Sequence, residues 1–231
     1  MKIQWFGQSA FKVTSKNGVV LFDPFLSGNP KFTGDPAAVT EGTTHVLVSH
    51  GHNDHFGDTI DILKRTGATL VTTPELGDYV ESKFPKAKVH SMNPGGTREI
   101  GGITVGCVRA HHSNSYLQQD GTVIYGGEPT GLIAHIEGER IYHMGDTCAF
   151  GDMALIEELH HPTIGLVPVG DNYTMGQAEA ALAVNRWFNF RAVVPMHYGT
   201  FPVLDQDAER FESLVEKSEV WMMGPMEERE L

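Results

Sequence analysis

Residues 45–58 read HVLVSHGHNDHFGD, an apolar run that leads directly into a dense set of histidines and acids. The run has the composition of a buried β-strand, and a helical stretch is expected to follow it. At a strand end, side chains two residues apart point the same way, so His50 and His52 can share one target. Asp54 and His55 come where the chain turns and can face a second point nearby. These nitrogen and oxygen donors predict a metal site that suits zinc, iron, manganese or nickel.

Short β-like runs alternate with amphipathic helical stretches along the rest of the chain. Runs rich in Val, Ile, Thr and aromatic residues predict strands at Ile3–Val13, Gly18–Phe22, His45–Ser49, Thr69–Thr72, Lys88–Ser91, Ile103–Arg109, Val123–Tyr125, Leu132–Glu137, Arg140–His143, Ile164–Pro168, Ala192–Met196 and Val220–Met222. Apolar residues at helical spacing predict helices at Asp58–Arg65, Glu75–Phe84, Asp152–Leu159, Gln177–Phe188 and Asp205–Lys217.

The order of these elements predicts the fold class. Hairpin turns are expected at Asn17–Gly18 and Glu137–Arg140. Each half of the chain opens with hairpins and continues with strand–helix units, which indicates two similar halves packed sheet to sheet with helices outside. We therefore expect an α/β protein: an αββα sandwich in one domain over residues 1–231, with pseudo-symmetric halves at about 1–122 and 123–231.

Composition narrows the class of function. The chain has 17 basic and 29 acidic residues, for a formal net charge of −12, so its surface should repel phosphate backbones and anionic headgroups. Its 40% hydrophobic content supports a buried core. No apolar run approaches the ~18 residues of a membrane span, and no secretory leader is recognisable. We expect a cytoplasmic protein with neither a nucleic-acid partner nor a membrane span, and with Cys107 and Cys148 unpaired.

The H-x-H-x-D-H string at residues 50–55 resembles the signature of the metallo-β-lactamase superfamily. Together with WFGQSAF, LFDPF, GEPTG, GDT, PVGDNYTMG and PMHYGTFP, it resembles a bacterial family of metal-dependent hydrolases related to ascorbate-6-phosphate lactonase and N-acylphosphatidylethanolamine-hydrolysing phospholipase D. The similarity spans nearly the whole chain. It implies the metallo-β-lactamase type of αββα fold and a centre of two divalent ions, zinc first, with manganese, iron or nickel as alternatives.

The resemblance also implies a ligand set. Metal 1 would be held by His50, His52 and His112, metal 2 by Asp54, His55 and His197, with Asp146 bridging the two ions. His111 competes with His112 because the two are adjacent after a predicted strand. Asp23, in LFDPF, matches an aspartate that supports the site without ligating. Gln8 stands where many relatives carry histidine, and its role is left open.

Several other residues are weighed at the same time. Asp171 and Tyr173 follow a predicted strand, so they contact substrate or support the site, unless their loop only caps the next helix. Cys148 follows the bridging aspartate closely but is expected to be a small buried side chain. His143 should turn to another face, with a supporting hydrogen bond as the alternative. The segment 24–39 lacks a clear period and is either functional or a surface connection.

The implied reaction is the attack of a metal-bound hydroxide on a small ester, lactone or phosphoester. Asp54 and Asp146 are the catalytic candidates, since Asp54 can orient the hydroxide and pass its proton onward. The ions, the two aspartates and the hydroxide leave a charge of about +1 in the site, so the small-molecule substrate is expected to be anionic.

Three other functions compete with this one. A ribonuclease of the same fold is disfavoured by the acidic composition and by the lack of clustered Lys and Arg. An iron-dependent oxygenase would require glutamate at position 52, where the chain has His52. A catalytically idle metal-binding protein has no chemical need for a bridging aspartate. Whether the chain forms a homo-oligomer is left open.

Overall fold

The computed structural model describes all 231 residues. Its strands are β1 (Lys2–Trp5), β2 (Phe11–Ser15), β3 (Gly18–Phe22), β4 (Thr43–Leu47), β5 (Thr69–Thr72), β6 (Lys88–Ser91), β7 (Thr97–Ile100), β8 (Ile103–Arg109), β9 (Ser115–Leu117), β10 (Val123–Tyr125), β11 (Thr130–Ile136), β12 (Glu139–His143), β13 (Ile164–Pro168), β14 (Ala192–Met196), β15 (Glu219–Val220) and β16 (Glu228–Glu230). Its helices are α1 (Pro36–Val39), α2 (Asn53–Phe56), α3 (Thr59–Thr66), α4 (Pro74–Lys83), α5 (Met153–His160), α6 (Gln177–Trp187) and α7 (Glu209–Leu214).

Two seven-stranded mixed sheets hold most of the strands. Their orders are β16-β1-β2-β3-β4-β5-β6 and β15-β14-β13-β12-β11-β8-β7, while β9 and β10 form a separate two-stranded ribbon. In each sheet, antiparallel hairpins are followed by parallel strands. The hairpins predicted at Asn17–Gly18 and Glu137–Arg140 join β2 to β3 and β11 to β12, as expected.

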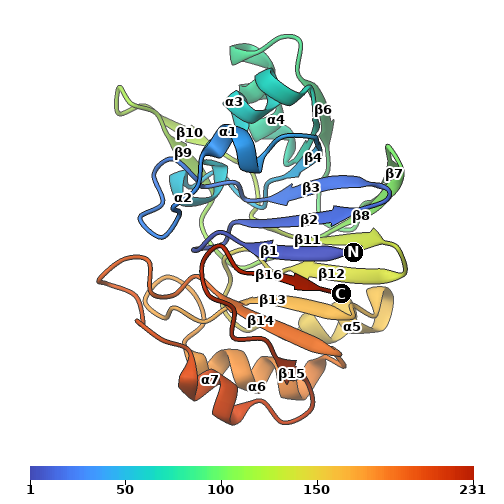
Figure 1. The fold of residues 1–231 in the computed structure, drawn as a ribbon, viewed down its shortest axis with the longest axis vertical. Coiled ribbons are helices and arrows are strands. Elements are labelled where there is room, and N and C mark those ends of the chain that lie inside the picture. Colours follow the sequence, from blue (N-terminus) through green and yellow to red (C-terminus); the bar gives the residue numbers. More distant parts are fainter.

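Three apolar clusters hold the layers together. The largest, with 24 buried residues, lies between the sheets and joins Phe22 and Leu47 of the first to Leu132 and Leu166 of the second. A 13-residue cluster packs α3 and α4 on the outer face of the first sheet, and a 19-residue cluster packs α5, α6 and α7 on the second. Figure 1 shows these two groups of helices at opposite ends of the molecule with the strands between them. The predicted αββα sandwich is confirmed.

The structure corrects several predicted boundaries. The predicted strand Ile3–Val13 is two strands, β1 and β2, joined by a tight turn in which Gln8 has a φ of 52°. The predicted helix Asp205–Lys217 is reduced to α7. The second sheet begins with β7, and β16 returns to the first sheet beside β1. The change of sheet therefore does not fall at the predicted boundary between residues 122 and 123.

The carboxyl ends of β3, β4, β8, β12 and β14 lead into Asp23, the 50–55 segment, His112, Asp146 and His197. Strands β3 and β4 are parallel, and so are β12, β13 and β14. Strand β8 runs parallel to β12 because both are antiparallel to β11 between them. These residues consequently lie along one edge of the sandwich.

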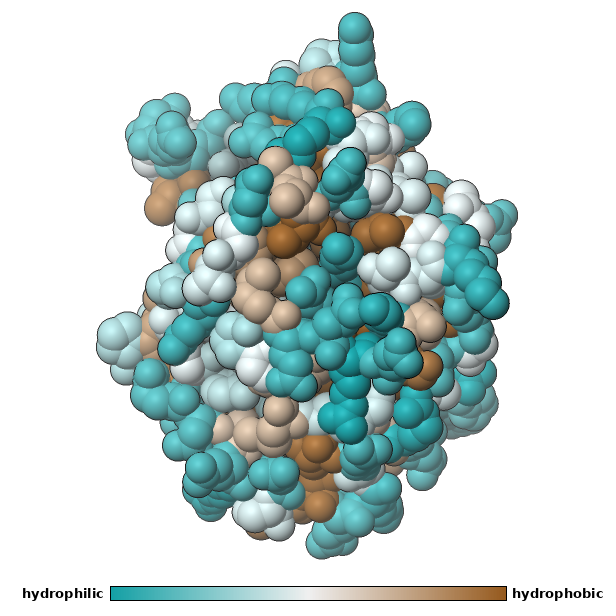
Figure 2. Space-filling model, in the orientation of Figure 1, coloured by the Kyte–Doolittle hydropathy of each residue, from teal (hydrophilic) through white to brown (hydrophobic).

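One face of the molecule is shown by residue hydropathy in Figure 2. The face in Figure 2 is largely hydrophilic, with hydrophobic residues in small separate areas. None of the helices combines the length and the apolar character that crossing a lipid bilayer would require.

Gly145, directly before Asp146, provides a test of how tightly the chain is packed at the edge of the sandwich that carries the candidate site residues. It has a φ of 63°, and a Cβ there would lie 2.7 Å from the Thr130 carbonyl oxygen. Gly67 has a φ of 69° with no atom within 4 Å of such a Cβ. We expect Gly67→Ala to cost about 1 kcal/mol of unfolding free energy through backbone strain alone, and Gly145→Ala about 3 kcal/mol.

Urea unfolding of both variants in the presence of a chelator measures this difference. Equal losses of stability would show that the edge yields to an added methyl group and that its packing does not fix the loop.

Candidate metal centre

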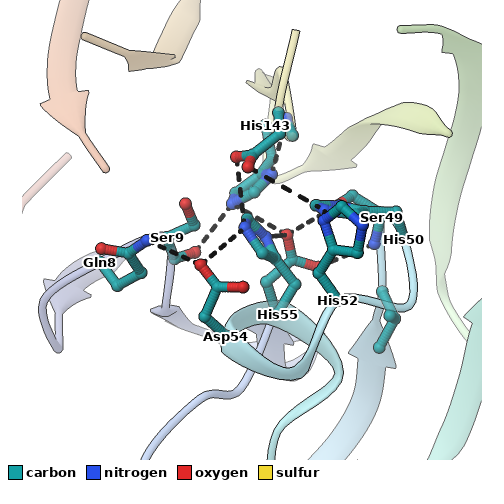
Figure 3. A network of polar contacts seen from close by, with 12 residues as sticks. Gln8, Ser9, Ser49, His50, His52, Asp54, His55 and His143 are labelled. Carbon is teal, nitrogen blue, oxygen red and sulfur yellow. Dashed lines mark hydrogen bonds and ion pairs between the residues drawn. The ribbon is translucent and has the colours of Figure 1, made fainter. Parts of the chain in front are cut away.

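The segment after β4 turns its donors toward two neighbouring points. His50 is buried, and its Nε2 lies 3.1 Å from Nδ1 of His52, the residue that precedes α2. Asp54 and His55 lie on α2 itself, so their side chains leave the backbone in a different direction. Figure 3 shows the four side chains gathered above this short helix. His50 and His52 share one target although β4 ends at Leu47, so the segment between β4 and α2, and not the two-residue period of a strand, positions them.

His112 completes the first group of donors. Its Nε2 lies 3.2 Å from Nδ1 of His52, and the donor atoms of His50, His52 and His112 all lie within 4.8 Å of one another. Two nitrogen ligands at about 2.0–2.1 Å from a tetrahedral zinc ion are about 3.3–3.4 Å apart. The separations in the structure are close to that value, so this group, called trio 1, fits a divalent ion.

A second group, trio 2, consists of Asp54, His55 and His197, whose donor atoms also lie within 4.8 Å of one another. Asp54 Oδ2 is 3.7 Å from His55 Nε2 and 3.6 Å from His197 Nε2. This arrangement brings together the end of β14 and the first turn of α2, which are far apart in the sequence.

The carboxylate of Asp146 lies between the two trios. Its oxygens are 3.2 Å from His55 Nε2 and 3.0 Å from His197 Nε2 on one side. On the other side they are 3.6 Å from His112 Nε2 and 4.0 Å from His50 Nε2. The Asp146 carboxylate therefore reaches histidine nitrogens of both groups.

Buried atoms without partners support metal binding. His55 Nε2 and Asp146 Oδ1 are buried and lie 3.2 Å apart, but their geometry does not make a hydrogen bond. Leaving such groups unsatisfied is costly, and a divalent ion would coordinate both. The donors are imidazole nitrogens and carboxylate oxygens with no thiolate, a set that suits zinc, manganese, iron or nickel.

Asp23 and Ser49 fix the orientation of two of these histidines. Asp23 Oδ2 accepts hydrogen bonds from His55 Nδ1 at 2.7 Å and from the Ser49 hydroxyl at 2.6 Å, while Oδ1 accepts from Ser49 N at 2.7 Å. Ser49 Oγ in turn lies 3.0 Å from His50 Nδ1 and can accept its proton. When the two histidines are neutral, these contacts leave their Nε2 lone pairs facing the centre.

Asp23, His50 and His55 also lie close enough to form a third possible metal group. However, the oxygens of Asp23 already accept these three hydrogen bonds, so they are not free to coordinate an ion. Asp23 thus contacts His55 and Ser49, and the supporting role that the resemblance implies for it stays a prediction.

Two residues at the site have contacts that sequence reasoning did not assign. The side-chain Nε2 of Gln8 donates to Asp54 Oδ2 at 2.9 Å, a contact drawn in Figure 3. The backbone carbonyl of Gln8 accepts from His197 N at 3.0 Å. Ser49 makes the contacts described above. The WFGQSAF motif signals a role near Gln8, but the long-range partner is visible only in the fold. Ser49 could have been suspected only from its position directly before His50.

His143 lies near the candidate metal centre, but its ring nitrogens are not free to bind a metal ion. Its Nε2 donates to the Ser9 carbonyl at 2.8 Å, and its Nδ1 accepts from Gly145 N at 3.2 Å. Its ring stacks on Phe22 with centroids 5.4 Å apart. Both nitrogens are therefore used in holding the edge of the sheets together.

The structure separates the remaining candidates. The His111 ring packs on Phe150, with centroids 4.6 Å apart. Of the two adjacent histidines, His112 is the one whose ring nitrogen lies beside His52. Tyr173 lines a cavity of about 610 Å³ that opens over the donors. Asp171 does not line it, and its carboxylate instead accepts from Asn172 N at 2.7 Å. Cys148 is exposed rather than buried as expected.

The two trios differ in charge. Burial lowers the pKa of all three histidines of trio 1, so that they are neutral near pH 7. In trio 2, burial acts in the same direction, but the carboxylate of Asp146 outweighs it, together with that of Asp54. The pKa of His55 is raised well above its usual range, and that of His197 to about 9. Without metal, trio 2 therefore carries protons that trio 1 does not.

Known proteins resemble this chain over most of its length. A model of the β-lactamase superfamily domain matches residues 2–197. The chain belongs to the metallo-β-lactamase superfamily. Within it, the chain is 52% identical over 227 residues to a UPF0173 metal-dependent hydrolase of Chelativorans sp. strain BNC1, and 47% identical to one of Mesorhizobium japonicum, with 97% of each chain covered in both cases.

A solved structure is also similar to this chain. Igni18, a metallo hydrolase from the hyperthermophilic archaeon Ignicoccus hospitalis, superimposes with a TM-score of 0.85 and 33% identity. The match covers 100% of this chain and 98% of Igni18. The chain is thus a metal-dependent hydrolase with the metallo-β-lactamase fold, as its motifs predict.

Two buried serines allow the support from Ser49 to be tested. Ser49→Ala removes a donor to Asp23 and the partner of His50 Nδ1, so we expect it to cost about 2 kcal/mol of unfolding free energy. Ser9 is equally buried, but its hydroxyl has no partner, so Ser9→Ala removes an unsatisfied polar group and should not lower stability. Chemical denaturation with chelator present measures both, and equal effects would contradict the assigned network.

Proposed function

We propose that the protein is a hydrolase with two metal ions, metal 1 at trio 1, metal 2 at trio 2 and Asp146 bridging them. The observation that carries this proposal is the position of the Asp146 carboxylate, which lies within 3.0–3.6 Å of a histidine nitrogen of each trio. Zinc is the first candidate for both ions, with manganese, iron or nickel as alternatives, because the donor set accepts all four. When bound, such ions supply a water that is ionised near neutral pH and a Lewis acid for a carbonyl or phosphoryl oxygen.

The protein's own contribution is orientation and proton handling. Asp54 is held at Oδ2 by the Gln8 amide, and its side chain faces the cavity. There it can orient the attacking oxygen, take up its proton and release it to the leaving group. Asp23 keeps His55 in the tautomer with Nε2 free, and Ser49 does the same for His50.

The substrate proposed is a small ester, lactone or phosphoester with an anionic group beside the scissile bond. The attraction for that group comes from the ions alone, since no Lys or Arg lines the cavity. A ribonuclease function is disfavoured for the same reason, because binding to a phosphate backbone requires several cationic side chains.

Removing the bridge tests the two-metal proposal. We expect Asp146→Ala to bind fewer than two ions per chain and to lose at least about a hundredfold in kcat/KM on any ester or phosphodiester that the parent protein turns over. Metal content by elemental analysis and turnover assays measure this. Asp61→Ala, on the exposed side of α3, is the matched control and should keep both. Full metal content and turnover in Asp146→Ala would contradict the bridge.

The charge difference between the trios predicts two pH dependences. The raised pKa values of His55 and His197 mean that both are protonated at pH 7, so an ion at trio 2 must displace protons and its affinity should rise between pH 7 and 9. The histidines of trio 1 have lowered pKa values and are already neutral, so affinity there should change little.

Calorimetric titration of chelator-treated protein in buffers of different ionisation enthalpy counts the protons released at each step. Release of at least one proton is expected for one ion and almost none for the other. Equal release at both steps would contradict the assignment of the trios.

A further inference from the structure

The cavity over the metal centre has two chemically different walls. One carries His52, Asp54, His112, Asp146 and His197. The other is formed by Phe25, Tyr173, Phe201, Val203 and Leu204. Nothing in the proposed hydrolysis requires this second wall, because the reacting bond would lie against the first.

The apolar wall is built by three loops at the same edge as the metal ligands. Phe25 follows β3, Tyr173 follows β13, and Phe201, Val203 and Leu204 follow β14. The rings of Phe25 and Phe201 approach with centroids 6.4 Å apart and so join two of these loops. Tyr173 and Val203 are 59% and 53% exposed, so apolar surface faces water where a ligand would cover it.

The cavity lining contains no Lys or Arg side chain that could pair with a distant anionic group. The other lining residues are Gln8, Asn53 and Ser113, which are uncharged, and no Lys or Arg reaches the cavity. A phosphate or sulfonate held away from the metal centre would lose hydration without gaining a cationic partner. The volume of about 610 Å³ is in the range for a single small molecule.

We propose that the substrate carries an uncharged alkyl or aryl group next to its reacting carbonyl or phosphoryl centre, and that this group packs between Phe25, Phe201 and Leu204. This inference rests on the proposed hydrolase function and narrows it. Any anionic part of the substrate lies at the metal centre, and the part remote from the metal centre is apolar. Substrates with a phosphate far from the scissile bond are excluded.

The test uses two matched esters: methyl 3-phenylpropionate and its 4-sulfophenyl counterpart. The two methylene groups insulate the ester from the ring substituent, so the intrinsic reactivities are similar. We expect the metal-loaded protein to hydrolyse the neutral ester with a kcat/KM at least about tenfold higher. A calorimetric measurement should show the product 3-phenylpropionate binding more tightly than its sulfonated form by a similar factor.

A pair of variants connects this preference to the wall. Val203→Lys adds a cation at an exposed position of the wall and should shift the ratio toward the sulfonated ester by about tenfold. Leu182→Lys is the control, since Leu182 is 54% exposed on α6 and does not line the cavity, so it should leave the ratio unchanged.

Equal turnover of the two esters, or a preference for the sulfonated one, would overturn the apolar-group proposal while leaving the hydrolase proposal intact. Absence of turnover for every ester and phosphodiester by protein holding two ions would count against the hydrolase proposal instead. In that case product binding decides: tighter binding of 3-phenylpropionate supports the apolar wall as a ligand site, and equal binding overturns it.

Discussion

Asp23, fully buried at the end of β3, accepts hydrogen bonds from two separate parts of the candidate site. It binds the Nδ1 proton of His55 on α2 and both donors of Ser49 after β4. Burial opposes its ionisation, but the nearby His143 and His55 hold its pKa below the usual range, so the carboxylate stays charged. Through these bonds, one side chain aligns a histidine of each trio, and its φ of 41° is the backbone strain that accompanies this position.

The balance of charges at the site explains why an acidic protein can have a centre that attracts anions. Trio 1 is neutral, and the carboxylates of trio 2 and Asp146 are balanced without metal by the protons of His55 and His197. Under the proposed function, divalent ions replace these protons and make the local charge positive, while the net charge of the whole chain stays negative. The apolar residues that line the same cavity add no charge of either sign. Electrostatic selection therefore acts only at the reacting centre.

How far the sequence could predict this arrangement depends on the range of each interaction. The strands that end at the ligands and both hairpin turns follow from local patterns, and the αββα order follows from their succession. The elements missed were β7, β9, β16, α1 and α2, each of three or four residues and too short for a recognisable period. The choice between His111 and His112 depends on how the chain leaves β8, and the contact of Gln8 with Asp54 depends on a tight turn packing against a helix 46 residues away.

Each donor group is assembled across the interface between the two sheets. Trio 1 takes His50 and His52 from the first sheet's edge and His112 from the second, while trio 2 takes Asp54 and His55 from the first and His197 from the second. The relative position of the donors is therefore set by the 24-residue cluster that packs the sheets together. Interiors of this kind are close-packed and transmit small displacements rather than absorbing them. The residues that determine the donor-to-donor distances thus include Phe22 and Leu132. Their side chains carry no polar atom and cannot themselves bind a metal ion. The packing of the two sheets therefore sets the relative positions of the donor residues. The hydrogen bonds of Asp23 then fix the orientation of the His50 and His55 rings within that arrangement.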